Sequence, residues 1–186
     1  YLSAVLNLMQ LLQMIMQGRW HHESSLKVLP GLRDTNLELL AKRGIHCIPQ
    51  FLALLDKEAT GALAKAHVAS NAITRMIDVK NRLPVLDMRI NEMEYNEEEG
   101  TITVKMHIDR LSKHTGQAYT PNYTKFKDEG YWVVIGDLSA GTVLSDGTRS
   151  GELLALKRVT IDRALKTELV IPLAKALRMS DSMYGS

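Results

Sequence analysis

The chain is poor in cysteine, proline and aromatic residues, and neither sign of charge dominates its 186 residues. Its one cysteine, Cys47, excludes a disulfide within the chain and a cysteine-rich zinc site. Lys and Arg number 23 against 21 Asp and Glu, and this balance excludes a strongly basic nucleic-acid coat as the main feature. The 45% hydrophobic share argues against wholesale disorder. The composition predicts a globular protein of a reducing compartment.

The chain also lacks a long uninterrupted hydrophobic run. The most apolar stretch, Leu2 to Met16, contains polar residues at positions 7, 10 and 13 and is followed by Gln17. It is too short for a comfortable bilayer span. Polar residues at three- and four-residue steps place one polar stripe on an otherwise apolar helix. We therefore predict a helix buried on most sides in a helical bundle, and no membrane association.

Sequence motifs for catalysis or metal binding are missing as well. The glycines of the later loop do not have phosphate-loop spacing, and no Gly-Lys-Ser or Gly-Lys-Thr occurs. A Gly-x-Ser-x-Gly nucleophile motif is absent. The six histidines are isolated or adjacent in pairs, without the spacing of a zinc site. We predict no catalytic residue, no cofactor and no metal in this segment.

The residues before position 82 predict short helices separated by turns. A first helix ends near Gly18, and Pro49 fits the first turn of another. Between them, a capping box of Thr35 and Glu38 predicts a helix that Gly44 ends. A further helix is expected from Lys57 to Ile77.

After residue 82 the apolar period changes from helical to alternating. Residues 86–90 and 102–108 predict an antiparallel hairpin with an acidic turn at 96–100. The apolar run 131–135 suits a central strand, and two more strands are expected at 153–159 and 167–171. Short strands joined by turns indicate a β-sandwich.

Basic residues give the only hint of a ligand. Arg19, Lys27, Lys42 and Arg43 could contact phosphate if they shared a face, and solvation of helix ends is the favoured alternative. Lys42 and Arg43 are the candidates for RNA contact. Residues 119–127 interleave aromatic and basic side chains. We expect this stretch to fold as a loop over the sandwich edge, with a nucleic-acid-binding stripe as the alternative.

Five stretches of the chain carry a family resemblance. The most specific is Glu-Gly-Tyr-Trp-Val-Val-Ile-Gly-Asp at 129–137, within the longer stretch 121–137. The others are 13–20, 24–30, 152–158 and 179–185. Together they resemble the Sec-sixty-three-type unit of Ski-two-like RNA helicases, most of all in its spliceosomal, U-five small nuclear ribonucleoprotein form. The resemblance covers nearly the whole chain.

The resemblance implies an α+β chain of three modules. Residues 1–30 would be the tail of a helical bundle, 31–81 a helix-loop-helix domain and 82–186 a fibronectin-III or immunoglobulin-like sandwich. The sandwich core would contain Trp132, Val134, Leu154 and Leu156. The stretch 173–178 is shorter than in the family, and the closing strand after Gly185 is absent. We therefore expect the sandwich to be incomplete in this chain.

The resemblance also implies a function. The unit would be a non-catalytic support for an ATP-dependent RNA helicase of pre-mRNA splicing, in the nucleus, with ATP and Mg²⁺ bound by the motor elsewhere in the parent chain. Its partners would be that helicase core, the large spliceosomal scaffold protein, other U-five proteins and, through the parent, RNA. Two alternatives remain: the same unit of the activating-signal-cointegrator helicase, in ribosome quality control or DNA repair, and a translocon subunit in protein import into the endoplasmic reticulum.

Overall fold

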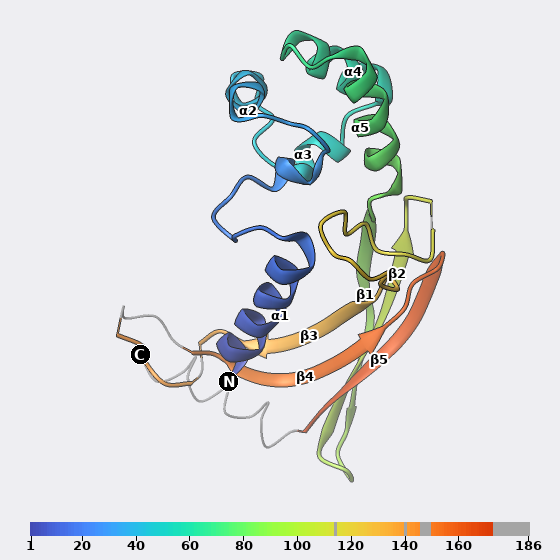
Figure 1. Cartoon of the computed structure of the whole chain (residues 1–186). Helices are drawn as coiled ribbons and strands as arrows, with labels where there is room; N and C mark the ends of the chain where they lie inside the picture. The colour runs from blue at the N-terminus through green and yellow to red at the C-terminus, as the bar shows by residue number, and fades with distance from the viewer. Residues whose placement is uncertain (114, 140, 146–149, 173–186) are drawn as a thin grey trace. The chain divides into compact units, whose positions relative to one another are not determined.

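The computed structural model describes residues 1–113, 115–139, 141–145 and 150–172 of the chain (Figure 1). The chain is α+β and divides into two compact units. The sheet unit comprises Tyr1–Gln13, Leu86–Leu111 and Asp128–Ser186, and the helical unit comprises Met14–Val85 and Ser112–Lys127. The domain limits 1–30, 31–81 and 82–186 stay predictions. The stretches 173–178 and 179–185 lie outside the described residues.

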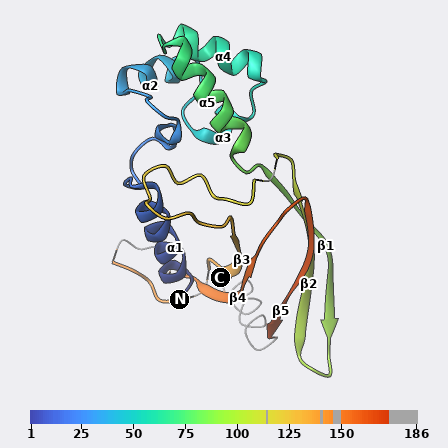
Figure 2. The same cartoon turned by 45° about the vertical axis from the view of Figure 1, so that its right-hand side comes forward.

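Helix α1 (Leu2–Gln17) belongs to both units, and the remaining helices lie together in the helical unit (Figures 1 and 2). These are the 3-10 helix η1 (Ser25–Val28), α2 (Asp34–Ala41), α3 (Ile48–Leu52), α4 (Asp56–Lys65) and α5 (Ser70–Arg82). Glycines in the left-handed region end α1 and α2 as predicted, with φ of 59° at Gly18 and 77° at Gly44. Pro49 lies in the first turn of α3, also as predicted.

The predicted capping box of Thr35 and Glu38 is wrong, because the N-cap of α2 is Arg33 and the helix begins at Asp34, two residues earlier than predicted. Asn36 takes the capping role instead. Its Oδ1 accepts the backbone N–H of Arg33 at 2.9 Å, and its Nδ2 donates to the carbonyl of Ala66 at 2.8 Å. The second bond joins positions 30 residues apart, so tertiary structure selected the cap.

The single helix predicted from Lys57 to Ile77 is also wrong, since α4 ends at Lys65 and α5 begins at Ser70. His67 lies between them at φ 60°, the one non-glycine residue with positive φ among the described residues. The N–H of Val68 donates to the carbonyl of Leu63 at 3.1 Å, which closes a Schellman motif. Glycine usually occupies this left-handed position, so the sequence carried no stop signal.

The helical unit has its own hydrophobic core. Phe51, Leu40, Leu63 and Met76 are fully buried there, together with Leu26 and Leu29.

Helix α1 was predicted to be buried on most sides, but most of its large apolar side chains are exposed. Only Leu2 of that helix is buried, whereas Leu6, Leu8, Leu11, Leu12 and Ile15 are exposed.

A buried amine ties α5 to the start of α4. Lys80 donates from Nζ to Oδ1 of Asp56 at 2.9 Å, and Asn81 donates to Oδ2 at 2.9 Å. These hydrogen bonds, that of Lys80 first, lower the pKa of Asp56 below its usual value. Because the folded-state pKa is lowered, the stabilisation is present above the usual carboxyl pKa and is lost as the pH falls through the lowered one.

We therefore expect Asp56→Asn to destabilise the chain by about 1 kcal/mol at pH 7, a figure reduced for the exposure of the carboxylate. Urea unfolding at a series of pH values measures this effect. The difference from the wild type should shrink in acid, where the wild-type carboxylate is protonated. A difference that stays constant down to acid pH would contradict the ion-pair explanation.

The sheet unit contains two antiparallel sheets. One has the order β1-β2-β5, from β1 (Leu86–Asn96), β2 (Thr101–Arg110) and β5 (Ala164–Pro172). The other pairs β3 (Tyr131–Asp137) with β4 (Glu152–Val159). The predicted hairpin and its acidic turn are confirmed, with Met88 opposite Ile108. Within the described residues β3 pairs with β4 alone, and its place as a central strand stays a prediction.

Both sheets contribute to one hydrophobic core, but three residues predicted for it lie elsewhere. Trp132 is 45% exposed, Leu156 is 41% exposed, and Val134 is half-buried outside the core cluster. Their strand neighbours Tyr131, Val133 and Ile135 pack into the core, as does Leu154. The placement of Trp132, Val134 and Leu156 in the core was therefore wrong.

The register of β3 and β4 explains why Leu154, alone of the four residues predicted for the core, lies in it. Val134 pairs with Leu156 and Ile135 with Ala155, but Gly136 then pairs with Leu153, so Leu154 is the extra residue of a bulge. The bulge inverts the alternation and places Leu154 and Leu156 on opposite faces. On the outer face the guanidinium of Arg158 lies 6.0 Å from the ring centroid of Trp132.

Candidate nucleic-acid interface

The net charge of the whole chain is close to zero, but the two units carry net charges of opposite sign. The helical unit has 13 Lys and Arg against 6 Asp and Glu, a net charge of +7. The sheet unit has 10 against 15, a net charge of −5. A concentrated positive charge attracts polyanions and accelerates their association. The helical unit is therefore the candidate nucleic-acid interface.

Lys42 and Arg43, the predicted RNA contacts, follow directly after α2 and are both exposed. Lys42 is the C-cap residue of that helix, where a cation also offsets the helix dipole. Neither side chain forms an ion pair with any residue that the structure describes. Both charges are thus available to a phosphate, and the RNA contact stays a prediction.

The segment 112–127 adds to this charge. Residues 119–127 within it were expected to fold over the sandwich edge, but they belong to the helical unit. The side chain of Gln17 donates to the carbonyl of Tyr119 at 2.9 Å, and that of Asn122 donates to the carbonyl of Gln17 at 2.8 Å. The segment brings three lysines and no acidic residue. The aromatic and basic residues of this segment do not show by themselves which unit the segment packs against.

One cleft of the helical unit contains both cations and carboxylates, and its lysine is paired internally. It has a volume of about 700 Å³ and is lined by Arg19, Lys27 and Arg33 together with Glu23 and Asp34. Lys27 lies 3.0 Å from the carboxylate of Asp34 and 3.5 Å from that of Glu23. The hydrogen bond to Asp34 raises the pKa of Lys27. The two carboxylates in its lining make this cleft less favourable for an anion than a cleft without acidic residues.

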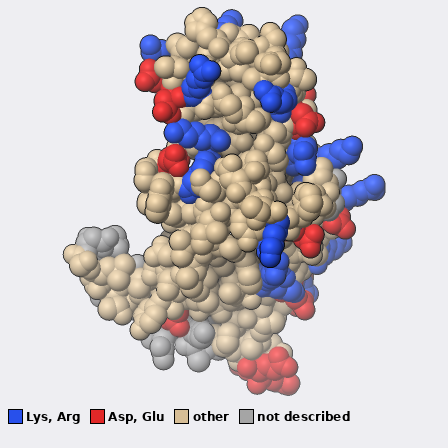
Figure 3. Space-filling model, in the orientation of Figure 1, with Lys and Arg blue, Asp and Glu red and all other residues tan. Residues whose placement is uncertain are grey.

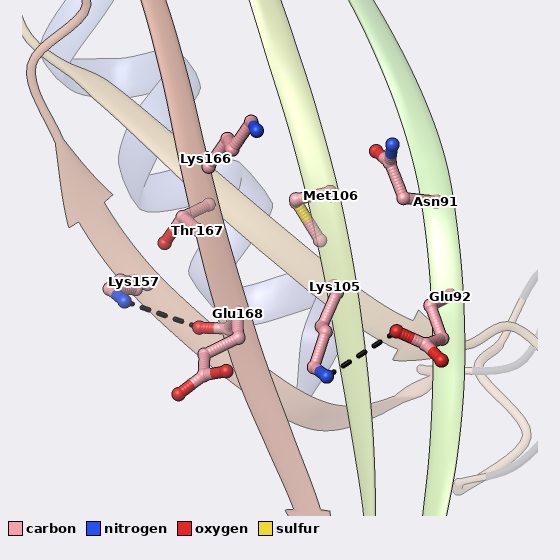
Figure 4. Close-up of a pocket in the computed structure, with 8 residues that line it drawn as sticks. All are labelled: Asn91, Glu92, Lys105, Met106, Lys157, Lys166, Thr167 and Glu168. Atoms are coloured by element: carbon pink, nitrogen blue, oxygen red, sulfur yellow. Dashed lines mark hydrogen bonds and ion pairs between the residues drawn. The ribbon is translucent and has the colours of Figure 1, made fainter.

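The sheet unit offers an acidic surface and a cleft of mixed charge. Three consecutive glutamates, 97–99, form the tip of the β1–β2 hairpin, where acidic side chains gather in Figure 3. The cleft, about 530 Å³, lies against β1, β2 and β5 (Figure 4). Its Lys105 is paired with Glu92 and Glu94, and Lys157 donates to the carbonyl of Glu168 at 3.2 Å. Neither feature favours binding of an anion.

The described part of the chain lacks two further kinds of site. No group of three or more His, Cys, Asp or Glu residues there could hold a metal ion. No helix among those residues is long and apolar enough to cross a membrane.

Comparisons with known proteins identify a family and several relatives. The sequence profile of the Sec63 Brl domain matches residues 1–183. The chain is 32% identical over 176 residues to the DExH-box ATP-dependent RNA helicase DExH14 of Arabidopsis thaliana, an alignment covering 92% of this chain and 8% of the relative. It is 25% identical over 171 residues to the human U5 small nuclear ribonucleoprotein 200 kDa helicase, covering 91% of this chain and 7% of that helicase.

A third relative is activating signal cointegrator 1 complex subunit 3 of Mus musculus, 26% identical over 210 residues, with 86% of this chain and 9% of that protein covered. The chain thus spans less than a tenth of the length of each of these relatives. The family resemblance carried by the sequence motifs is confirmed.

Proposed function

Because the chain belongs to the Sec63 Brl domain family, we propose that it is a non-catalytic accessory unit of an ATP-dependent RNA helicase of the spliceosome. The family membership carries this proposal, since relatives named as RNA helicases contain a matching segment. The small share of each relative that the chain spans supports a motor located elsewhere in a longer protein, with ATP and Mg²⁺ bound there. A nuclear location, as part of a U5 particle, belongs to the same proposal.

The two units have different tasks in this proposal. The helical unit, with its +7 charge, lies along the path of the RNA, and Lys42 and Arg43 contact the backbone. The sheet unit is a fibronectin-III or immunoglobulin-like sandwich that docks partner proteins, including the large spliceosomal scaffold protein. Two antiparallel sheets around one core support this assignment. The exposed pair of Trp132 and Arg158 supports docking, because tryptophan and arginine are enriched at interface hot spots.

The test of the helical-unit task is charge reversal in the full-length helicase. We expect Lys42→Glu with Arg43→Glu to lower RNA unwinding about threefold or more, because two attractive phosphate contacts become repulsive. The matched control is Lys57→Glu with Lys65→Glu, which makes the same charge change on exposed residues of α4. Unchanged unwinding and RNA affinity in the Lys42 and Arg43 variant would reject this role.

A second candidate function is the equivalent unit of an activating-signal-cointegrator-type helicase. The observation that favours it is the 26% identity to the mouse subunit, beside 25% for the human U5 helicase. Affinity purification of the native parent protein, with mass spectrometry and RNA sequencing, separates the two. U5 proteins and small nuclear RNA would support the splicing proposal. Ribosomal or repair partners would favour the cointegrator type, and translocon channel subunits would favour a role in protein import.

A further inference from the structure

A second cleft of the helical unit differs in charge from the others. It has a volume of about 490 Å³ and lies among the start of α2, the turn after α4 and the first turns of α5. Its polar lining includes Arg33, Thr35, His67 and Arg75. None of the described residues that line it is Asp or Glu.

One buried side chain holds two walls of this cleft together. Asn36 accepts the N–H of Arg33 and donates to the carbonyl of Ala66, the residue before His67. Its side-chain oxygen and its amide nitrogen are both used, and the residue is buried. The backbones that carry Arg33 and His67 are therefore fixed relative to each other before any ligand arrives.

The third wall is one face of α5. Ala69, Ala72 and Arg75 line the cleft at intervals of three residues, which places them on the same side of the helix. Two of these side chains are small, which leaves room beside the guanidinium. Ala69 is also the N-cap residue, no side chain caps the helix, and its first turn contains no acidic residue. The positive end of α5 adds to the field of the cleft.

The arginines of this cleft have no internal partner. Neither Arg33 nor Arg75 forms an ion pair with a residue in the described part of the chain. The acidic neighbour of Arg33 is Asp34, whose carboxylate bonds to Lys27 at 3.0 Å. The cleft thus presents two guanidinium groups, an imidazole and a hydroxyl without a compensating carboxylate.

His67 gives a separate indication of function. A non-glycine residue in the left-handed region is strained, and such residues concentrate at functional sites. Glycine would form the same turn without strain. The presence of a histidine at this position is explained if its side chain, which lines the cleft, has a ligand.

We propose that this cleft binds one phosphodiester group of single-stranded RNA, gripped by Arg33 and Arg75 with His67 and Thr35 as hydrogen-bond donors. Guanidinium groups match the oxygen geometry of phosphate, and hydroxyl and imidazole N–H groups complete the donor set. The +7 charge of the surrounding unit favours a polyanion over a singly phosphorylated peptide. The inference rests on the proposed function and names an RNA contact of the same unit.

The test measures binding of a fluorescein-labelled oligouridylate to the 186-residue chain by anisotropy over a range of salt concentrations. We expect Arg33→Gln with Arg75→Gln to weaken binding about tenfold, the effect of losing charge-assisted hydrogen bonds. The slope of log affinity against log salt should fall by about 0.7, the value for one phosphate of a single strand. A decrease of about 1.4 in this slope would mean that Arg33 and Arg75 bind two separate phosphates, and it would overturn the proposal of one shared phosphate site. The control, Lys57→Gln with Lys65→Gln, removes the same charge from α4.

Replacing His67 with glycine separates folding from binding. We expect His67→Gly to raise the melting temperature, because it removes backbone strain, and to weaken RNA binding severalfold. Weaker binding by a more stable protein is not a consequence of unfolding. Unchanged RNA affinity in this variant would remove His67 from the site.

The remaining outcomes also decide the proposal. Unchanged affinity and salt slope in the Arg33 and Arg75 variant, or no RNA binding by the wild-type chain, would overturn the cleft assignment. Neither result would remove the accessory role, which is measured by unwinding in the full-length helicase. A phosphoserine peptide that displaces the oligonucleotide from the wild type but not from the variant, at lower concentration than unlabelled RNA, would reassign the cleft to protein recognition.

Discussion

Replacing Glu129 with alanine is expected to destabilise the sheet unit by about 3–5 kcal/mol, the cost of leaving a buried charge without its partner. The carboxylate is only 6% exposed, and the side chain of Arg110 beside it is fully buried. Arg110 Nη2 donates to Glu129 Oε2 at 3.0 Å, and Nη1 donates to Oε1. Nη1 also lies 3.0 Å from the hydroxyl of Tyr131. Without Glu129, the buried guanidinium loses both of these carboxylate hydrogen bonds.

Urea unfolding measures this prediction. A Trp20→Phe background leaves Trp132 of β3 as the only tryptophan and therefore reports on the sheet unit. The matched control is Glu99→Ala on the exposed hairpin tip, which should change stability by less than about 0.5 kcal/mol. The double variant Arg110→Leu with Glu129→Leu should recover much of the loss, because a buried ion pair can be replaced by apolar residues at little cost. A loss below about 1 kcal/mol in Glu129→Ala would contradict a buried, dry pair.

Replacing Phe51 with alanine is expected to destabilise the helical unit by about 3–5 kcal/mol. Phe51 lies in the short helix α3 and is fully buried among the leucines of that core. Removal of the ring takes away its burial and leaves a cavity that the surrounding helices fill only in part. The unit is small, so this loss is a large fraction of a typical domain stability.

The chain contains a matched control for this variant. Phe126, the only other phenylalanine, is 88% exposed, and Phe126→Ala should change stability by less than about 0.5 kcal/mol. A Trp132→Phe background leaves Trp20 as the reporter of the helical unit. Equal effects of the two phenylalanine variants would contradict the core described for this unit.

Local signals in the sequence predicted the features that depend on neighbouring residues. Gly18 and Gly44 end helices because only glycine adopts the left-handed conformation without strain. The β1–β2 hairpin followed from strict alternation on both sides of an acidic turn. The family was recognisable from the stretch 129–137 and its companions. Each of these inferences depends on residues close together in the chain.

Features that depend on distant residues were missed. The outward face of β3 was taken for the core face, because an apolar run such as 131–135 does not show which face packs inward. The extra residue at Leu154, which turns that side chain into the core, also has no local signal. The break at His67 was missed because the residue adopts a conformation normally left to glycine. Residues 119–127 were expected at the sandwich edge, so the lysines of the segment 112–127 were not added to the charge of the helical unit.

The sequence alone determined the glycine-terminated ends of α1 and α2, the hairpin, the absence of a recognisable catalytic motif and the family, because each depends on short stretches of contiguous residues. Only the tertiary structure decided which charges share a surface. In the folded chain, the segment 112–127 belongs to the helical unit, and the carboxylate of Asp34 pairs with Lys27. The side chain of Asn36 links the start of α2 to the turn at His67. The physical reason is that a cleft is formed by segments more than 30 residues apart, whose approach is set by packing and buried hydrogen bonds rather than by local preference.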